Sequence, residues 1–368
     1  MADLAEVLLE STPQQSERFS GRDIFTLYPE LKDKHDGPGA FLSEMQAVTQ
    51  RKQRWAEDEL PGNDLRCQQL SSAAWTLMHS CSTGNGLLSW TRIHAAKPDR
   101  PYRASPSAMA QTVKAAAGLY GAAEVGIAPL DQSLFNLQQE GKPIRFEELD
   151  APQVTGSAFL VPRNFSHAVV LVVPMNPTLL QMTPSILGEA ATALGYSQSL
   201  FLVSSLAEFI RGLGYEAIPS INDIAQSVPL AISAGLGKLS RMNKLLSPRF
   251  GAAFRLCKVF TNMPLACDKP PASAIEDRCR HCHQCADHCP VQALSFSAEP
   301  GAEIRGPWNH PGHKAWFEDS YKCFSYWQEI GNGCALCLAA CPMTARLNKT
   351  TAADPEAWWQ SGGASTES

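Results

Sequence analysis

From about residue 105 onward, the spacing of apolar residues predicts alternating helices and strands. The short run AVVLVV, residues 168–173, is rich in β-branched side chains, which is typical of a buried strand. Ser105 and Pro106 precede an alanine-rich stretch, which predicts a capped helix followed by a strand. Residues 130–160 interrupt this pattern and are expected to be an excursion from the core.

A second, longer helix is predicted after the buried strand. Thr183 is expected to cap it, with Pro184 at its first position and an end near Gly212. Apolar residues three and four apart form a stripe along this helix, and Tyr196 lies on the stripe. Alone, a tyrosine in such a place is usually a core residue whose hydroxyl is satisfied.

Composition indicates a globular protein. Of the 368 residues, 44% are hydrophobic and 18% are charged, and the net charge is −5. The negative charge argues against nucleic-acid binding, and no apolar run is long enough to span a membrane. The N-terminus lacks the basic and apolar regions of a signal peptide, so a cytoplasmic protein is expected. A mature exported form from which a leader has been removed is the alternative.

Cysteines near the C-terminus carry the strongest chemical pattern. Eight of the twelve cysteines form two runs, C-x2-C-x2-C-x3-C-P at 279–290 and C-x10-C-x2-C-x3-C-P at 323–342. In two-cluster ferredoxins, the fourth cysteine of one run ligates the other cluster. We define the first cysteine set as Cys279, Cys282, Cys285 and Cys341, and the second as Cys289, Cys323, Cys334 and Cys337. Each set is predicted to hold one [4Fe–4S] cluster. Structural zinc is the alternative, although zinc usually takes two C-x2-C pairs. The four cysteines outside the sets are expected to be buried apolar residues: Cys67, Cys81, Cys257 and Cys267.

Most of the chain lies outside the cysteine region and is expected to hold the electron acceptor. No G-x-G-x-x-G stands between a strand and a helix, so a dinucleotide site is unsupported. The glycine-rich stretch 234–251 matches no phosphate loop and can be a helix C-cap and turn. Within it, KLSRMNK, 238–244, can be a solvated basic face. Residues 268–277 are a turn-rich linker.

These features together resemble the catalytic subunit of the reductive dehalogenases, a cobalamin-dependent family. The resemblance runs from about Ala115 to Pro342 and includes GAAEVGIAPL, FIRGLGYEAIPSIND and HKAWFEDSYKCFSYWQEIGNGCALCLAACP. It implies an α+β fold in which a nitroreductase-like cobalamin-binding domain precedes a ferredoxin-like domain with two [4Fe–4S] clusters. The expected division is an N-terminal region packing on the core at 1–104, the catalytic domain at 105–267, the cluster domain at 268–348 and a tail at 349–368.

The resemblance also implies the site residues. The family's tyrosine, asparagine and arginine match Tyr196, Asn222 and Arg255, with Tyr196 as the proton donor. Asn222 would hydrogen-bond the phenol or line the proton path, and the charge of Arg255 would favour the phenolate. The glycine-rich stretch would border the corrin ring, and its expected contacts are Gly235, Gly237, Ser247 and Arg249.

The implied function is reductive dehalogenation of a small organohalide at the Co(I) state of base-off cobalamin. The chain would receive electrons from a separate ferredoxin or flavodoxin. Two alternatives remain: a cobalamin enzyme resembling epoxyqueuosine reductase, which acts on tRNA, and a non-catalytic corrinoid or electron-transfer protein.

Overall fold

The computed structural model describes most of the chain after residue 97. The described residues are 65–75, 77, 88–91, 93, 98–136, 138–139, 142–270, 274–306, 309 and 311–345. Most of the N-terminal region expected at 1–104, the whole tail expected at 349–368 and Cys81 therefore lie outside the described residues.

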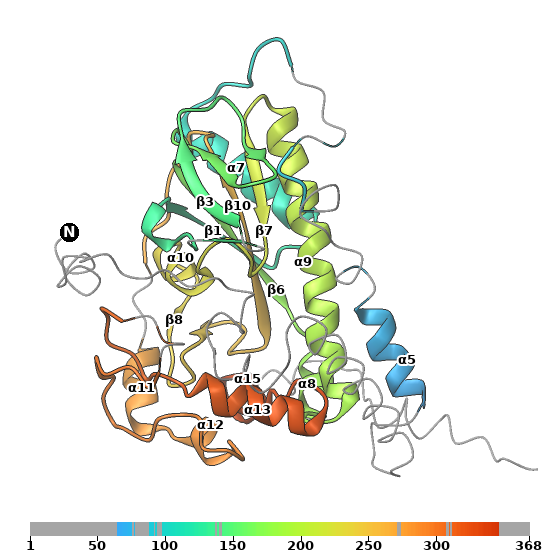
Figure 1. Ribbon diagram of the computed structural model, residues 1–368, viewed down its shortest axis with the longest axis vertical. Helices are drawn as coiled ribbons and strands as arrows, with labels where there is room; N and C mark the ends of the chain where they lie inside the picture. The colour runs from blue at the N-terminus through green and yellow to red at the C-terminus, as the bar shows by residue number, and fades with distance from the viewer. Residues whose placement is uncertain are drawn as a thin grey trace, which may run out of the picture.

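A four-stranded antiparallel sheet forms the centre of the larger part (Figure 1). Its order is β1 (Glu124–Pro129), β6 (His167–Pro174), β10 (Phe254–Thr261) and β7 (Ala217–Ser220). The register pairs Glu124 with Val172, and Val172 in turn with Leu256. The run AVVLVV lies in β6 as predicted, and all six of its residues are buried.

Helices cover both faces of this sheet, because alternate strand residues point to opposite sides. Helices α7 (Pro106–Leu119) and α9 (Ile186–Gly212) pack on one face, where Val169 and Leu171 of β6 join their apolar residues. Helix α10 (Ser227–Ser233) packs on the other face with Val170 and Val172. The result is a mixed α+β fold with one sheet between two apolar layers.

Local capping sets where the two long helices begin. Ser105 caps α7 as predicted, accepting a hydrogen bond from the Ala108 amide at 3.3 Å. The predicted start of α9 is wrong by two residues. Ser185, rather than Thr183, accepts from the Gly188 amide at 3.3 Å, and the Thr183 hydroxyl donates to the carbonyl of Leu180 instead. The short helix α8 (Pro177–Gln181) precedes this turn.

The excursion expected at 130–160 contains a second small sheet. A 3-10 turn, η1 (Gln132–Leu134), leads into it. The strands lie in the order β2 (Gln138–Gln139), β3 (Lys142–Glu147), β5 (Phe159–Pro162) and β4 (Gln153–Val154). Helix α5 (Leu65–Ala74) packs against α9 on the far side from the main sheet (Figure 1).

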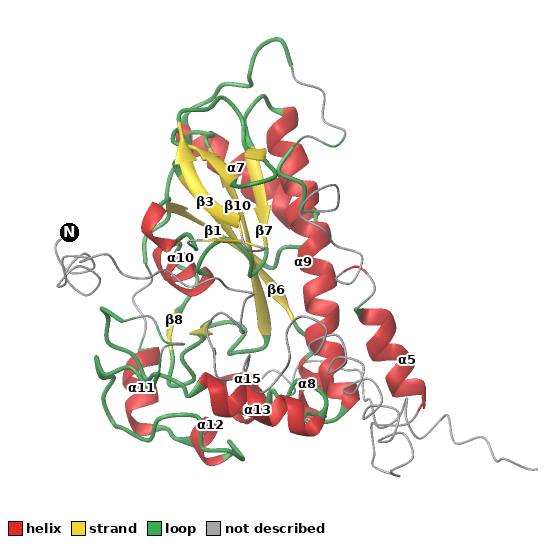
Figure 2. Cartoon of the chain, viewed as in Figure 1, coloured by secondary structure: helices red, strands yellow, loops and turns green. Residues whose placement is uncertain are grey.

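Short helices joined by long loops make up the cysteine region at the lower end of the molecule (Figure 2). They are α11 (Ile275–His281), α12 (Gln284–Asp287), α13 (Ser320–Ile330), α14 (Leu336–Ala340) and α15 (Pro342–Ala345). A hairpin of β8 (Lys238–Leu239) and β9 (Leu245–Leu246) reaches down to them from the larger part. Met175, Met242 and Leu246 share one apolar cluster with buried cysteines, so the two parts have a common core.

Among the described residues, no helix combines the length and the apolar character needed to cross a membrane.

Candidate functional site

Tyr196, Asn222 and Arg255 converge although they come from three separate elements. The Asn222 Nδ2 donates a hydrogen bond of 2.7 Å to the Tyr196 hydroxyl. The guanidinium carbon of Arg255 lies 4.7 Å from the centre of the Tyr196 ring, which is cation–π distance. The indole of Trp75 stacks on the same phenol ring, with ring centres 5.8 Å apart. Tyr196 is half-buried and Asn222 is exposed.

A glycine allows α9 to approach β10 at this point. A Cβ on Gly195 would lie 3.0 Å from Cγ of Arg255 and 3.3 Å from Cγ of Met175. One turn earlier in the helix, the Thr192 hydroxyl accepts a hydrogen bond of 2.8 Å from Nη2 of Arg255. The close approach therefore sets the position of the guanidinium beside the phenol.

Buried charges hold the loop that carries Asn222. The side chain of Asp223 is fully buried, and its Oδ1 accepts from the Ser220 hydroxyl at 2.6 Å and from the Ile221 amide at 3.0 Å. Lys258 is also fully buried, and its ammonium donates to the carbonyl of Ile221 and to the Ser227 hydroxyl. The amide and the carbonyl of Ile221, the residue before Asn222, are thus both held by buried side chains.

Lys258 was missed by the sequence reasoning. It stands in β10, FRLCKVFT, three residues after Arg255 and within the fully buried second half of the strand. Burial lowers the pKa of Lys258 to about 8, and the nearby carboxylate of Asp223 opposes part of that fall. A charged residue in a fully buried strand was the available signal, because such a residue needs a specific partner.

Three members of the first cysteine set are buried, and Cys282 is partly exposed. Burial raises the pKa of the Cys285 thiol to about 12, and nearby Cys337 and Cys341 raise it further. Burial also raises the pKa of Cys279, with Cys341 and Cys282 among its charged neighbours. Cys341 therefore lies with the first run of cysteines, as the proposed sharing requires.

All four members of the second cysteine set are partly exposed. Burial raises the pKa of Cys337 to about 11, and Cys334 and Cys289 contribute to the rise. Burial likewise raises the pKa of Cys323 to about 12, with Cys337 nearby. The Ala293 amide donates to the sulfur of Cys289 at 3.2 Å, the kind of contact that tunes cluster ligands. The electrostatic neighbours of these thiols mostly follow the two predicted sets, with Cys285 and Cys337 adjoining across them. Among the described residues, however, no three ligating side chains stand close enough together to hold a metal ion as they are placed.

Three of the four cysteines outside the sets lie in the described residues. Cys67 and Cys257 are buried as predicted. Cys267 is exposed, so the prediction is wrong there, because it lies in the extended segment that leaves the core after β10.

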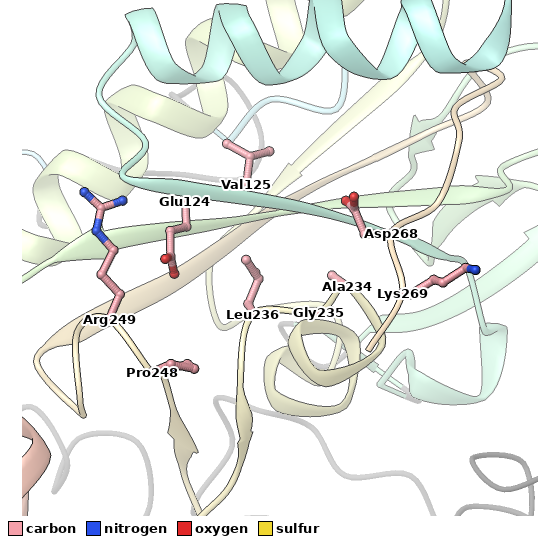
Figure 3. A pocket seen from close by; sticks show the side chains of 9 residues that line it. All are labelled: Glu124, Val125, Ala234, Gly235, Leu236, Pro248, Arg249, Asp268 and Lys269. Carbon is pink, nitrogen blue, oxygen red and sulfur yellow. The ribbon is translucent and has the colours of Figure 1, made fainter. Parts of the chain in front are cut away.

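The glycine-rich stretch lines a cavity of about 410 Å³ against β1 (Figure 3). Its walls are Glu124, Val125, Ala234, Gly235, Leu236, Pro248, Arg249, Asp268 and Lys269. Burial raises the pKa of Glu124, and the attraction of Arg249 offsets part of the rise. Glu124 points to the same side of the sheet as Gly126, two residues later in β1, and Gly126 packs against the end of α10. Arg255 points to the same side as Cys257, two residues later in β10, and Cys257 packs with α9 on the other face. The cavity and Tyr196 therefore lie on opposite faces of the sheet.

Three of the four residues expected to contact the corrin ring have a structural role within the fold itself. Gly235 follows α10 with φ of 82°, and a Cβ there would lie 2.5 Å from the Lys269 carbonyl oxygen. A Cβ on Gly237 would lie 2.3 Å from the Leu246 carbonyl oxygen. Ser247 is buried, and its hydroxyl accepts from the amides of Arg249 and Phe250. A corrinoid role for Gly235, Gly237, Ser247 and Arg249 stays a prediction.

Other polar atoms fit a bound group better. Nε of Arg255 is buried and has no hydrogen-bond partner in the part of the chain that the structure describes. Oδ1 and Nδ2 of Asn332, which is 5% exposed, are also buried without a hydrogen-bond partner among the described residues. Buried polar groups usually have partners, and the side chain amides of a corrinoid could supply them.

Comparisons with known proteins bear on the cysteine region and on the fold. Residues 278–344 match the family model "4Fe-4S double cluster binding domain". Tetrachloroethene reductive dehalogenases from Sulfurospirillum multivorans and Dehalobacter restrictus are 36% and 33% identical, over 66% and 62% of this chain. The chain spans about half the length of these relatives, 52% and 47%. A solved catabolic reductive dehalogenase has 22% identity and a TM-score of 0.60, and covers 78% of this chain and 40% of its own.

The fold and the matched domain first define a class, that of α+β proteins with a double [4Fe–4S] cluster domain, which sets aside the zinc alternative. Within that class, the chain is similar to the reductive dehalogenases, over about half of their length. An epoxyqueuosine reductase from Bacillus cereus is a more distant relative, at 28% identity over 58% of this chain and 57% of its own length.

Proposed function

We propose that the chain catalyses reductive dehalogenation of a small organohalide, with Tyr196 as the proton donor. The balanced reaction is R–X plus two electrons and one proton giving R–H and the halide ion. The observation that carries the proposal is the convergence of Asn222, Arg255 and Tyr196 in a chain that is similar to the reductive dehalogenases. In the proposed division, residues 105–267 form a nitroreductase-like catalytic domain and 268–348 form a ferredoxin-like domain with both clusters.

The cofactors of this proposal are a base-off cobalamin and two [4Fe–4S] clusters. Bound cobalamin would supply a strongly reducing cobalt centre, which performs the step that side chains cannot perform. Arg255 and Asn332 are proposed to contact it, because their buried polar atoms lack partners among the described groups. The two cysteine sets would hold the clusters.

The hydroxyl hydrogen of Tyr196 is not used in the hydrogen bond with Asn222. Asn222 donates to the phenol oxygen and so leaves the phenol hydrogen free to point at a substrate. After the transfer, the same hydrogen bond and the guanidinium beside the ring stabilise the phenolate. Arg255 keeps its charge throughout, because guanidinium does not lose its proton in proteins. The indole of Trp75 stacks on the ring and helps to fix its orientation.

Electrons are proposed to enter at the second cysteine set, which is the more exposed of the two. A separate ferredoxin or flavodoxin would deliver them one at a time. Cys285 and Cys337 are close enough to influence each other electrostatically, which places the two sets side by side for transfer to the buried one.

A second candidate is a reaction like that of epoxyqueuosine reductase, favoured by the more distant relative. The net charge of −5 suits a tRNA substrate less well than a small neutral one. A non-catalytic corrinoid or electron-transfer protein is the third candidate.

The experiment is anaerobic loading of the full chain with iron, sulfide and cobalamin, followed by metal analysis and a halide-release assay. About eight irons and one cobalt per chain are expected, because eight thiolates fill two cubane clusters. Chloride release from a chlorinated ethene, with a strong chemical reductant, supports the proposal. Full loading without halide release from chlorinated ethenes or halogenated phenols contradicts it, and a tRNA gel shift then tests the second candidate.

A further inference from the structure

The turn between β8 and β9 inserts two basic side chains into the cysteine region. Its geometry is fixed locally: the Ser240 hydroxyl donates to the Lys244 carbonyl at 2.8 Å, and Asn243 has φ of 54°. Arg241 and Lys244 lie three residues apart in this turn, and each faces a different cysteine set. The expectation of a solvated basic face is wrong for Arg241, which has no exposed surface.

Arg241 is surrounded by carbonyl oxygens of the first cysteine set and its neighbours. Nε donates to Cys282 O at 2.9 Å and to Cys279 O at 3.1 Å, and Nη2 donates to Cys279 O at 2.6 Å. Nη1 donates to the carbonyls of Ser295 and Ser297 at 2.8 and 2.6 Å. The guanidinium carbon also lies 5.2 Å from the centre of the buried Trp316 ring. Across the described ranges, Arg241 forms no ion pair with a carboxylate.

Lys244 faces the second cysteine set but is neutralised. Its ammonium forms an ion pair of 2.5 Å with Glu318, and the two side chains are 39% and 17% exposed. Cys323 and Cys337 both lie within the electrostatic influence of this pair. The second set therefore faces a cation and an anion together, whereas the first faces an uncompensated buried cation.

This asymmetry bears on reduction. A [4Fe–4S] cluster with four thiolates is an anion that gains a further negative charge when it is reduced. Burial opposes that gain and a nearby cation favours it, and both effects set the reduction potential. The first set is the more deeply buried, so burial alone would give its cluster the lower potential and hold electrons on the second. A buried cation acts strongly because its field is poorly screened.

We propose that the β8–β9 turn orders the two cluster potentials: Arg241 raises the potential of the cluster held by the first cysteine set above that of the cluster held by the second. Electrons that enter at the partly exposed second set then move on to the more buried first set. The proposal rests on the cluster part of the proposed function and on the sharing of cysteines given above, and it does not require dehalogenation.

The test is a redox titration of the cluster-loaded full chain, followed by electron paramagnetic resonance. Lys244→Gln removes a charge beside the second set only, so the potential that it lowers identifies the second cluster. That potential is expected to be the lower of the two in the unchanged protein. Glu318→Gln should raise the same potential, and the double variant should return it close to its original value. Lys114→Gln, which removes an ion-paired lysine on α7, should move neither.

Arg241 is tested by two further variants. Arg241→Gln should lower the reduction potential of the cluster held by the first cysteine set by at least about 59 mV. For one electron, this shift corresponds to a tenfold change in the ratio of reduced to oxidised cluster. Arg241→Lys keeps the charge and should keep most of the potential, although it loses part of the carbonyl contacts. Equal shifts in both Arg241 variants would show a structural clamp only and overturn the proposal.

The Lys244 series decides the matter even when Arg241 variants fail to hold clusters. If Lys244→Gln lowers the higher of the two potentials, the proposed order is wrong. Ordered potentials in a protein that releases no halide would contradict the proposed function alone. Potentials in the reverse order in a protein that does release halide would contradict this inference alone.

Discussion

At the scale of single residues, the geometry of the proposed proton donor depends on a charge that does not touch it. The ammonium of Lys258 holds the carbonyl of Ile221, and the next residue, Asn222, donates to Tyr196. Asp223 holds the same loop through the Ile221 amide, and its second oxygen, Oδ2, is buried without a partner in the described part of the chain. The loop is therefore held by two buried charged side chains, Asp223 and Lys258, whose burial and whose removal both cost folding free energy.

Replacing Lys258 with methionine should destabilise the protein by about 1–3 kcal/mol, because it leaves the buried carbonyl of Ile221 without its donor and removes a cation near the buried carboxylate of Asp223. Thermal unfolding of the cluster-loaded protein under anaerobic conditions measures this. Lys322→Met is the control, since that lysine is 56% exposed and should cost little. A Lys258 variant as stable as the control would show that the loop needs no ammonium.

The same variant tests the pKa of Lys258. That pKa falls from 10.5 to about 8 on folding, so between pH 8 and 10.5 the unfolded chain binds more protons than the folded one. Stability therefore rises with pH in that window, by up to about 1.4 kcal/mol per pH unit, and is independent of this group below pH 8. The wild-type advantage over Lys258→Met should grow between pH 8 and 10, and an advantage that shrinks there would contradict the assignment.

Sequence could supply Tyr196, Asn222 and Arg255 only through resemblance, since each is an ordinary residue type in its own element. Thr192 and Gly195 were missed because their roles depend on which strand α9 packs against. The packing of α9 on β10 is a tertiary contact, and no local sequence pattern predicts it.

At the scale of elements, the site needs the close crossing of α9 over β10. Gly195→Ala should gain helix propensity yet push Arg255 away from Tyr196, since the new Cβ would lie 3.0 Å from Cγ of Arg255. Turnover should fall roughly tenfold, because misplacing a catalytic group by a fraction of an ångström to one ångström is costly. Gly118→Ala in α7 is the matched control, because nothing lies within 4 Å of its Cβ position. Equal turnover in the two variants would argue against a role for this crossing.

The helices α14 and α15 bracket Cys341, which is assigned to the first set. Cys341→Ala should therefore damage the cluster of Cys279, Cys282 and Cys285, although these lie far away in the sequence. Iron analysis and spectroscopy of the remaining cluster measure this, with Cys257→Ala as a control thiol outside both sets. Selective loss of the other cluster would show that the sharing is wrong.

Elements with strong local signals were predictable. Ser105 with Pro106 marked the start of α7, and the β-branched run marked β6. The start of α9 was misplaced because Thr183 and Ser185 are equally good caps in sequence, and only the turn after α8 decides between them. The small sheet of β2 to β5 was missed because its strands are short and partly exposed.

At the scale of the whole molecule, the larger part and the cysteine region are joined by specific contacts. Besides Arg241, the Ala252 amide donates to the Thr344 hydroxyl at 2.9 Å, and Gln181 donates to the Ala339 carbonyl at 3.1 Å. Ala252 lies just before β10, which carries Arg255. The cysteine region is therefore fixed next to the start of the strand that carries Arg255.

The spacing of cysteines predicted this region well, because ligand geometry restricts the spacing itself. The glycine-rich stretch was harder to interpret, since a glycine required by a helix end and one required by a ligand look alike in sequence. The structure gives Gly235 the first reason.

The central claim is that this chain delivers a proton from Tyr196 during dehalogenation. The most direct measurement is halide release by Tyr196→Phe, with iron and cobalt contents equal to wild type and a strong chemical reductant in excess. The ring and its packing are preserved, so loading should be unchanged, while turnover should fall by at least about 100-fold. Tyr215→Phe, at the far end of α9, should release halide at the normal rate. Near-normal halide release by fully loaded Tyr196→Phe would contradict the account.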